Sequence, residues 1–250
     1  MLRNTLKKVC FFALLISFLY AAEALRMDAK ERAVLNVVAL SADHHDKSLL
    51  LHARVVQIRN YLLSHYVRPP KSEEQLEAWK NTRTFLRQAA LSTIEGKPAL
   101  CGELARLAIK VLKTQGIPAR RLYLYKSEAT NHVLFEYYDE QARTWILMDS
   151  YASTPFLTAL LDSRPLSVGD LIRTADPVRL VYDKYGYLPR APFFIFGEDV
   201  ARAIPYGVSW WYEEAYLIQA LAAFALGCIF TGLWVWLRYI EMNASNTSKG

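Results

Sequence analysis

Two long apolar segments lie near the ends of the chain, and shorter amphipathic segments lie between them. The first runs from Val9 to Ala22, and the second, Ala215–Leu237, carries no charged residue. A helix rises about 1.5 Å per residue, so the second segment extends about 34 Å, which suffices to cross a bilayer. The pattern therefore predicts a transmembrane helix in the second segment.

Aromatic residues flank this predicted helix on both sides, as they do at membrane–water interfaces. They are Trp210, Trp211, Tyr212 and Tyr216 on one side and Trp234, Trp236 and Tyr239 on the other. We assign residues 210–239 to a transmembrane helix with aromatic flanks and 240–250 to a polar tail. Small residues recur at every fourth position of the helix, at Ala223, Gly227 and Thr231. This stripe would either pack against another helix or face lipid.

The N-terminal segment fits two interpretations. Basic residues precede the apolar run, and Ala22-Glu23-Ala24 follows it, as in a signal peptide with a small-x-small cleavage site. An uncleaved membrane anchor has a similar pattern, but the apolar run is short for a complete span, which favours cleavage. Residues 1–25 are therefore expected to be a signal peptide or an N-terminal membrane anchor.

Charges next to the two segments predict how the chain is oriented. Basic residues precede the first segment, whereas Glu213 and Glu214 precede the second and Arg238 follows it. The positive-inside rule then places residues from about 26 to 213 on the periplasmic or extracellular side. We expect a single-pass or two-pass membrane protein, depending on whether the first segment is removed.

Helices are predicted between the first apolar segment and residue 90. Residues 46–66 place aliphatic side chains on a broad face, and Pro69-Pro70 breaks the pattern. Ser72 and Gln75 resemble the capping box of a second helix, which reaches Ala90. Residues 151–209 are interrupted by six prolines, and we expect this segment to add a strand or two.

A further helix is predicted to begin at Cys101. Apolar residues recur there at three- and four-residue intervals up to Lys113, and Gly116 suits the position just beyond the helix end. Backbone N–H groups and the helix dipole favour a thiolate in the first turn and would also stabilise an oxyanion. Glu103, in the same turn, is interpreted as a partner of the helix dipole.

The other two cysteines lie in the apolar segments, at Cys10 and Cys228. Cys101 therefore has no disulfide partner within its own domain. A free thiol on the non-cytoplasmic side is exposed to oxidation, so its presence favours a functional role.

Residues 131–149 are predicted to form a β-hairpin, because two β-branched and aromatic runs are separated by a polar turn. If Glu136 faces Trp145, the same register places His132 directly opposite Asp149. Directly opposed side chains have Cβ atoms about 5 Å apart, within reach of an imidazole–carboxylate hydrogen bond. A thiol, an imidazole and a carboxylate are the components of an activated cysteine nucleophile.

With these residues identified, the stretch from Gly96 to Ser150 resembles the transglutaminase-like superfamily of papain-like cysteine enzymes. The matching parts are Cys101 at a helix start, Gly116-Ile-Pro-Ala-Arg120 leading into a strand, His132 at the start of the next strand, and Trp145-Ile-Leu-Met-Asp149. The resemblance implies that Cys101 is the nucleophile, His132 the general base and acid, and Asp149 the group that orients His132. Leu134 stands where the family often has an aromatic residue, a departure that bears on substrate preference.

Each of these residues also has a structural interpretation. Cys101 would be a small buried apolar residue, and His132 a surface residue or a hydrogen-bonded core residue. Asp149 would cap a turn with Ser150. Asp139 is the rival carboxylate, although its position in the turn directs it to solvent.

Composition limits the classes of partner. The net charge is +6, and basic residues are scattered among carboxylates without an aromatic-interleaved basic run, so nucleic-acid binding is not supported. His44, His45 and Asp46 lie together, but no second cluster has matching metal-ligand spacing. We expect neither a metal nor an organic cofactor.

The predicted fold class is α+β, a papain-like domain with helices packed on an antiparallel sheet, followed by the C-terminal transmembrane helix. The domain covers residues 26–209, with its core at about 72–150. The predicted function is acyl transfer by a Cys-His-Asp triad acting on a protein or peptide, either as a peptide or amide hydrolase or as a transglutaminase. The alternative is a catalytically inactive binding or assembly module that docks in a membrane envelope complex.

Overall fold

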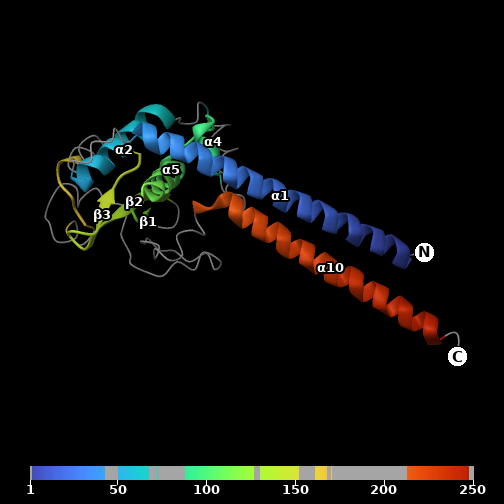
Figure 1. The fold of residues 1–250 in the computed structure, drawn as a ribbon. Coiled ribbons are helices and arrows are strands. Elements are labelled where there is room, and N and C mark those ends of the chain that lie inside the picture. The colour runs from blue at the N-terminus through green and yellow to red at the C-terminus, as the bar shows by residue number, and fades with distance from the viewer. Residues whose placement is uncertain are drawn as a thin grey trace. The chain divides into compact units, whose positions relative to one another are not determined.

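The computed structural model describes residues 2–42, 50–67, 72, 88–126, 130–151, 161–167, 170 and 213–247. Its elements are, in order, α1 (Leu2–Ala42), α2 (Leu51–Tyr66), α4 (Ala90–Ile94), α5 (Cys101–Thr114), β1 (Ala119–Lys126), β2 (Thr130–Asp139), β3 (Thr144–Met148) and α10 (Ala215–Thr247) (Figure 1).

The chain divides into two compact units. The helix-pair unit comprises Met1–Lys30 and Glu214–Gly250, and the domain unit comprises Glu31–Glu213. Helix α1 contributes to both, because it continues through the polar residues 26–30 without a break and ends at Ala42.

The domain unit contains an antiparallel sheet with strand order β1-β2-β3. Helix α5 packs on this sheet, and α2 and the last turns of α1 pack with α5 in the same apolar core. The buried residues of this core come from α1 (Leu35, Val38, Ala39, Ala42), α2 (Val55, Ile58, Leu62), α5 (Leu107, Ala108, Ile109, Val111, Leu112) and the sheet (Ala119, Phe135, Tyr137, Ile146, Met148). The predicted α+β class, with helices packed on a small antiparallel sheet, is confirmed.

The end of α5 follows the predicted pattern. Gly116 has φ +75°, a left-handed conformation that glycine adopts without a steric penalty. The N–H of Gly116 donates to the carbonyl of Lys113 at 3.1 Å, and that of Ile117 donates to Leu112 at 3.0 Å. These two bonds form a Schellman motif, which ends the helix and directs the chain into β1.

The hairpin formed by β2 and β3 is as predicted, except for its register. Tyr138 pairs with Trp145 and Asp139 with Thr144, so the turn contains the four residues 140–143. The predicted register required a two-residue turn and is therefore wrong by two positions. Asp139 explains the longer turn, because its Oδ1 accepts the N–H groups of Gln141 at 2.9 Å and Ala142 at 3.0 Å.

Several predicted features lie wholly or partly outside the described residues. Most of the helix expected after Ser72 is among them, and so is most of the proline-interrupted segment after residue 151. Within that segment residues 161–167 are described, and the carbonyl of Leu166 accepts the N–H of Leu147 at 2.8 Å. This bond attaches the segment to β3.

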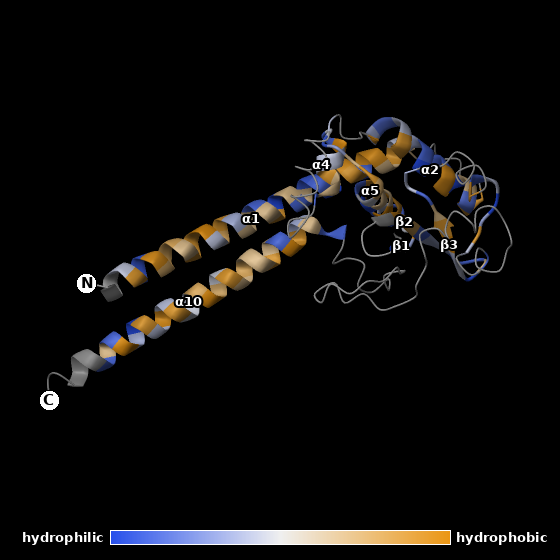
Figure 2. Ribbon diagram, turned by 180° about the vertical axis from the view of Figure 1, so that it is seen from behind, coloured by the Kyte–Doolittle hydropathy of each residue, from blue (hydrophilic) through white to orange (hydrophobic). Residues whose placement is uncertain are grey.

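The helix-pair unit consists of two long helices that lie side by side and antiparallel, with apolar residues along most of their length (Figure 2). Both are long and apolar enough to cross a membrane. Tyr20, near the middle of α1, donates a hydrogen bond at 3.1 Å to Gln219, near the start of α10, and the rings of Phe18 and Phe224 are 5.7 Å apart.

Gly227, in the small-residue stripe of α10, packs against α1. A Cβ atom added to Gly227 would lie only 3.3 Å from the ring of Phe18, so the absence of a side chain permits this close approach. At Gly227 the predicted helix packing is thus the role observed, whereas Thr231 at the end of the stripe is exposed.

Candidate active site

Cys101 is the first residue of α5, as predicted, and its side chain is half-buried. The first intrahelical bond runs from the N–H of Leu104 to the carbonyl of Leu100, at 3.0 Å. The N–H groups of the first turn have no acceptor within an α-helix, and they carry the positive end of its dipole. The thiol therefore lies where a negative charge on sulfur or on an attacked carbonyl oxygen is stabilised.

Glu103 completes the start of this helix. Its Oε2 accepts the N–H of Leu100 at 3.2 Å, and the residue is buried. A carboxylate in the first turn is favourable for the helix, in line with its predicted role, although its charge opposes a thiolate at Cys101.

Asp149 follows the last residue of β3 and is 1% exposed. Its Oδ1 accepts the N–H of Tyr151 at 2.9 Å, so it does cap a turn, with Tyr151 rather than Ser150 as the donor. A carboxylate has acceptor sites on both oxygens, so this bond is compatible with a second role.

The observed register changes the relation between His132 and Asp149. His132 pairs with Leu124 on β1, and Phe135 pairs with Met148 on β3. Continued by one residue, the β2–β3 register sets Asp149 opposite Leu134, so His132 and Asp149 are diagonal rather than direct neighbours. Diagonal positions on antiparallel strands are about 7–8 Å apart. The predicted direct pairing of His132 with Asp149 is therefore wrong, and the catalytic roles of the two residues remain predictions.

The side chain of Ser150 lies between the backbones of Cys101 and Val133, the residue after His132. Its Oγ lies 3.1 Å from the carbonyl oxygen of Cys101 and 3.3 Å from that of Val133, and the side chain is 3% exposed. Val133 follows His132 directly, and Ser150 follows Asp149 directly. The start of α5, the start of β2 and the end of β3 therefore meet at one buried hydroxyl.

Comparisons with known proteins find a similarity over the part of the chain that contains these residues. A family model described as "Transglutaminase-like superfamily" matches residues 40–150. Residues 40–150 are therefore similar to the transglutaminase-like superfamily.

Other comparisons add little. No curated protein matches the chain. A solved structure described as "Crystal structure of a TGase" is similar, with a TM-score of 0.44 and 16% sequence identity. The similarity covers 71% of this chain and 44% of that chain, so this chain spans less than half of that protein's length.

The sequence patterns did not single out Arg59, which interacts electrostatically with Asp149. It is 2% exposed, lies on α2 and donates a hydrogen bond to Asp162. Burial lowers the pKa of Arg59, and the negative charge of Asp149 opposes this effect, so the two groups are electrostatically coupled. The signal was present in the sequence, because Arg59 lies four residues after Val55 and three before Leu62 on the buried face of α2.

Ser150 had no comparable signal, since its neighbours across the sheet and on α5 are distant in sequence. The alternative carboxylate Asp139 accepts two N–H groups within its own turn. The possible metal ligands His44, His45 and Asp46 lie outside the described residues.

Proposed function

We propose that the chain is a membrane-anchored cysteine acyl-transfer enzyme in which Cys101, His132 and Asp149 are the catalytic residues. The main support for this proposal is the position of the Ser150 hydroxyl, which lies within hydrogen-bond distance of the carbonyls of Cys101 and Val133. One buried contact thus links the thiol-bearing turn to the residues adjoining the imidazole and the carboxylate.

The reaction has two steps. The Cys101 thiolate attacks the carbonyl carbon of an amide, and backbone N–H groups at the start of α5 stabilise the oxyanion. His132 then protonates the departing amine, which leaves a thioester on Cys101. In the second step water or an acceptor amine loses a proton to His132 and attacks the thioester, which frees the thiol. Asp149 orients the imidazole throughout.

These residues serve a protease, a peptide amidase and a cross-linking enzyme equally well. The three differ in the acceptor of the acyl group, which the groove around the thiol selects. The proposal is therefore acyl transfer from an amide or peptide.

The test is the rate of alkylation of Cys101 as a function of pH, with and without His132→Ala. The full chain is used in lipid nanodiscs, and modification is followed by mass spectrometry of the Cys101 peptide. We expect His132→Ala to slow alkylation at neutral pH by roughly 100-fold, the size of typical acid–base contributions. His65→Ala, which changes an exposed histidine of α2, is the control and should have no effect.

An alkylation rate that is indifferent to His132 would contradict the proposal. A biological function that survives Cys101→Ala would do the same and would favour the non-catalytic docking module.

We further propose that α1 is retained as an anchor and that α1 and α10 cross the membrane as an antiparallel pair. Lys7 forms an ion pair with Glu241, which supports placing both chain ends on the same side. With the positive-inside rule this assigns the ends to the cytoplasmic side and the domain unit to the periplasmic or extracellular side.

A photoreactive benzoylphenylalanine in place of Phe18 tests this pairing. It should cross-link to α10, and Gly227→Ile should abolish the product because the new side chain occupies the contact. Gly232→Ile is the matched control, since nothing lies within 4 Å of its Cβ position. Removal of residues 1–25 in the mature protein would contradict a retained anchor.

A further inference from the structure

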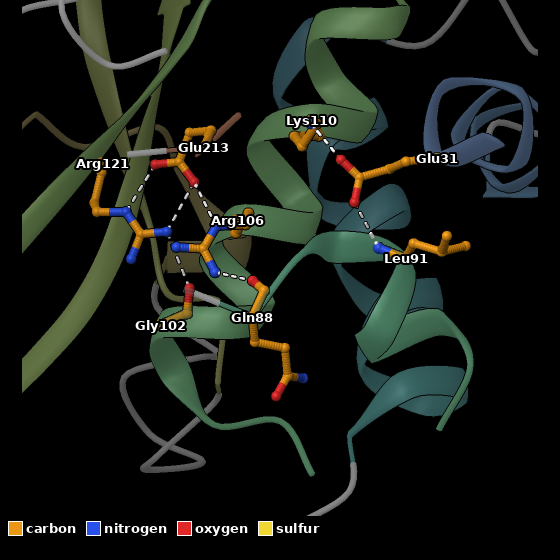
Figure 3. A network of polar contacts seen from close by, with 8 residues as sticks. All are labelled: Glu31, Gln88, Leu91, Gly102, Arg106, Lys110, Arg121 and Glu213. Atoms are coloured by element: carbon orange, nitrogen blue, oxygen red, sulfur yellow. Dashed lines mark hydrogen bonds and ion pairs between the residues drawn. The ribbon is translucent and has the colours of Figure 1, made fainter. Parts of the chain in front are cut away.

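A buried ionic cluster lies beside the first turn of α5, where Arg121 contacts the carbonyl of Gly102 (Figure 3). Its centre is the fully buried carboxylate of Glu213, which lies between two guanidinium groups. Arg121 donates from Nε at 2.7 Å and from Nη2 at 2.8 Å, so this pair is bidentate. Nε of Arg106 lies 3.5 Å from the same carboxylate. Both arginine side chains are also buried.

The charges of the cluster keep Glu213 ionised. Burial raises the pKa of this carboxyl, but Arg121, Arg106 and Lys113 together outweigh burial, so its pKa lies below the ordinary value. A carboxylate and two guanidinium groups leave one positive charge in excess among these three side chains.

The arginines use their remaining donors on backbone atoms. Nη2 of Arg121 donates to the carbonyl of Gly102 at 3.1 Å, and Arg106 donates to the carbonyl of Gln88. Gly102 directly follows Cys101, so the guanidinium of Arg121 is attached to the nucleophile-bearing turn. Since Arg121 belongs to β1, which pairs with β2, the cluster ties this turn to the strand next to the one that carries His132.

Stability alone is a weak reason for such a cluster. Buried ion pairs are often no more stabilising than apolar side chains of similar volume, because removing the charges from water is costly. Hydrogen bonds, however, join particular donor and acceptor atoms, so they fix the distance between the two elements that carry these atoms. Apolar contacts fix that distance less closely.

We propose that Arg121 and Glu213 are positioning residues that hold the Cys101 turn at the distance and angle at which Cys101 reacts with the help of His132. The proposal rests on the proposed function. Arg121 acts through the Gly102 carbonyl, and Glu213 acts by fixing the guanidinium of Arg121. Neither role requires contact with the reacting atoms.

Glu31 of α1 offers a matched control, because it also forms a buried ion pair with a residue of α5. It is a fully buried carboxylate that pairs with Lys110 of α5 and accepts the N–H of Leu91 at 2.8 Å (Figure 3). Lys110 lies nine positions after Cys101, so this pair holds the middle of α5 rather than its first turn.

The experiment measures how strongly His132 and Cys101 are coupled. Alkylation of Cys101 is followed at neutral pH in the full chain in nanodiscs, because a fragment ending before residue 213 would lack Glu213. Arg121→Lys, Glu213→Gln and Glu31→Gln are each made with and without His132→Ala, and circular dichroism melting reports whether each variant is folded. Arg121→Lys keeps the charge but loses the bidentate fork.

We expect His132→Ala to slow alkylation strongly in the otherwise unchanged protein and in Glu31→Gln. In Arg121→Lys and Glu213→Gln, the slowing of alkylation caused by His132→Ala should be about tenfold smaller, as expected when two reacting groups are misaligned. A purely electrostatic role predicts a different result, because Glu213→Gln leaves two uncompensated cations that would speed alkylation.

The outcomes separate the two proposals. If His132→Ala has no effect even in the unchanged protein, the proposed function is wrong and the positioning role falls with it. If His132→Ala slows alkylation in the unchanged protein and slows it equally in folded Arg121→Lys and Glu213→Gln, only the positioning role is overturned. If neither variant folds whereas Glu31→Gln does, the cluster is a stability element and the positioning role is likewise overturned.

Discussion

The two ends of α5 are held in different ways. At the first turn, two side chains from other elements contact helix carbonyls, since Ser150 donates to the carbonyl of Cys101 and Arg121 to that of Gly102. At the last turn, Leu112 and Ile117 pack in the apolar core. Gly116 ends the helix through the Schellman motif.

The difference shows how a helix is placed on a sheet with the accuracy that chemistry requires. Apolar packing is non-directional, so it favours burial of a face without selecting one position along the helix axis. Hydrogen bonds to particular carbonyls have narrow ranges of distance and angle. Changes at the first turn should therefore alter reactivity, whereas changes at the last turn should alter stability alone.

Asp149→Asn is expected to have the largest effect on reactivity. It keeps an acceptor for the N–H of Tyr151 but removes the charge that, in the proposed triad, orients and stabilises a protonated His132. Acyl transfer, once a substrate is available, should fall by roughly a thousandfold or more, as expected for a triad carboxylate. The assay is the single-turnover rate of thioester formation.

Asp139→Asn is the matched control for this change. Asp139 also accepts N–H groups in a turn, but it lies at the other end of the hairpin from Asp149. An equal loss of rate in both variants would mean that turn capping, and not charge, explains the effect of Asp149.

Ser150→Ala should have the next largest effect. It leaves two carbonyls without this buried donor, so the free energy of unfolding should fall by about 1–3 kcal/mol. Alkylation of Cys101 should also slow in the folded protein. Denaturant unfolding and the alkylation rate are measured on the same samples.

Thr114→Val is the equivalent change at the other end of α5. The Thr114 hydroxyl donates to the carbonyl of Val111 at 2.7 Å, and valine preserves the shape of the side chain. Slower alkylation in this variant would remove the distinction between the two ends.

Gly116→Ala should lower stability and nothing else. An added Cβ has no neighbour within 4 Å, so the cost comes from the left-handed backbone conformation and is about 1–2 kcal/mol. Thermal unfolding should report the loss. A simultaneous change in the pH profile of Cys101 alkylation would contradict the division proposed here.

His52 is expected to give the smallest effect, and one that depends on pH. Its Nδ1 lies 2.7 Å from the hydroxyl oxygen of Tyr137. Burial lowers the pKa of His52, with Arg59 lowering it further and the Leu161 backbone and Asp139 opposing the shift. The folded state therefore resists protonation that the unfolded state accepts below about pH 6.5, so stability is lost as the pH falls through that value.

His52→Gln should remove this part of the pH dependence. Urea midpoints measured from neutral to mildly acidic pH for both proteins isolate the contribution of His52, because the other histidines are common to both. Parallel curves would show that His52 does not resist protonation in the fold.

Local patterns predicted much of the domain. The apolar periodicity after Cys101 and the position of Gly116 correspond to α5 and its end, and the two apolar runs around Asp139 correspond to β2 and β3. The register was not predictable in the same way, since the choice between a two- and a four-residue turn depended on the Asp139 carboxylate accepting two N–H groups. The slip of two residues keeps every side chain on its own face of the sheet.

The sequence by itself determined the helix that begins at Cys101, the hairpin of β2 and β3 and the apolar C-terminal helix, because these depend on residues close together along the chain. Only the tertiary structure selected Ser150 as the hydroxyl shared by Cys101 and Val133, and Glu213 as the partner of Arg121, 92 positions away. With 30 basic and 24 acidic residues in the chain, no local pattern identifies that pair. Such contacts arise only when packing of the apolar faces has brought distant backbones together.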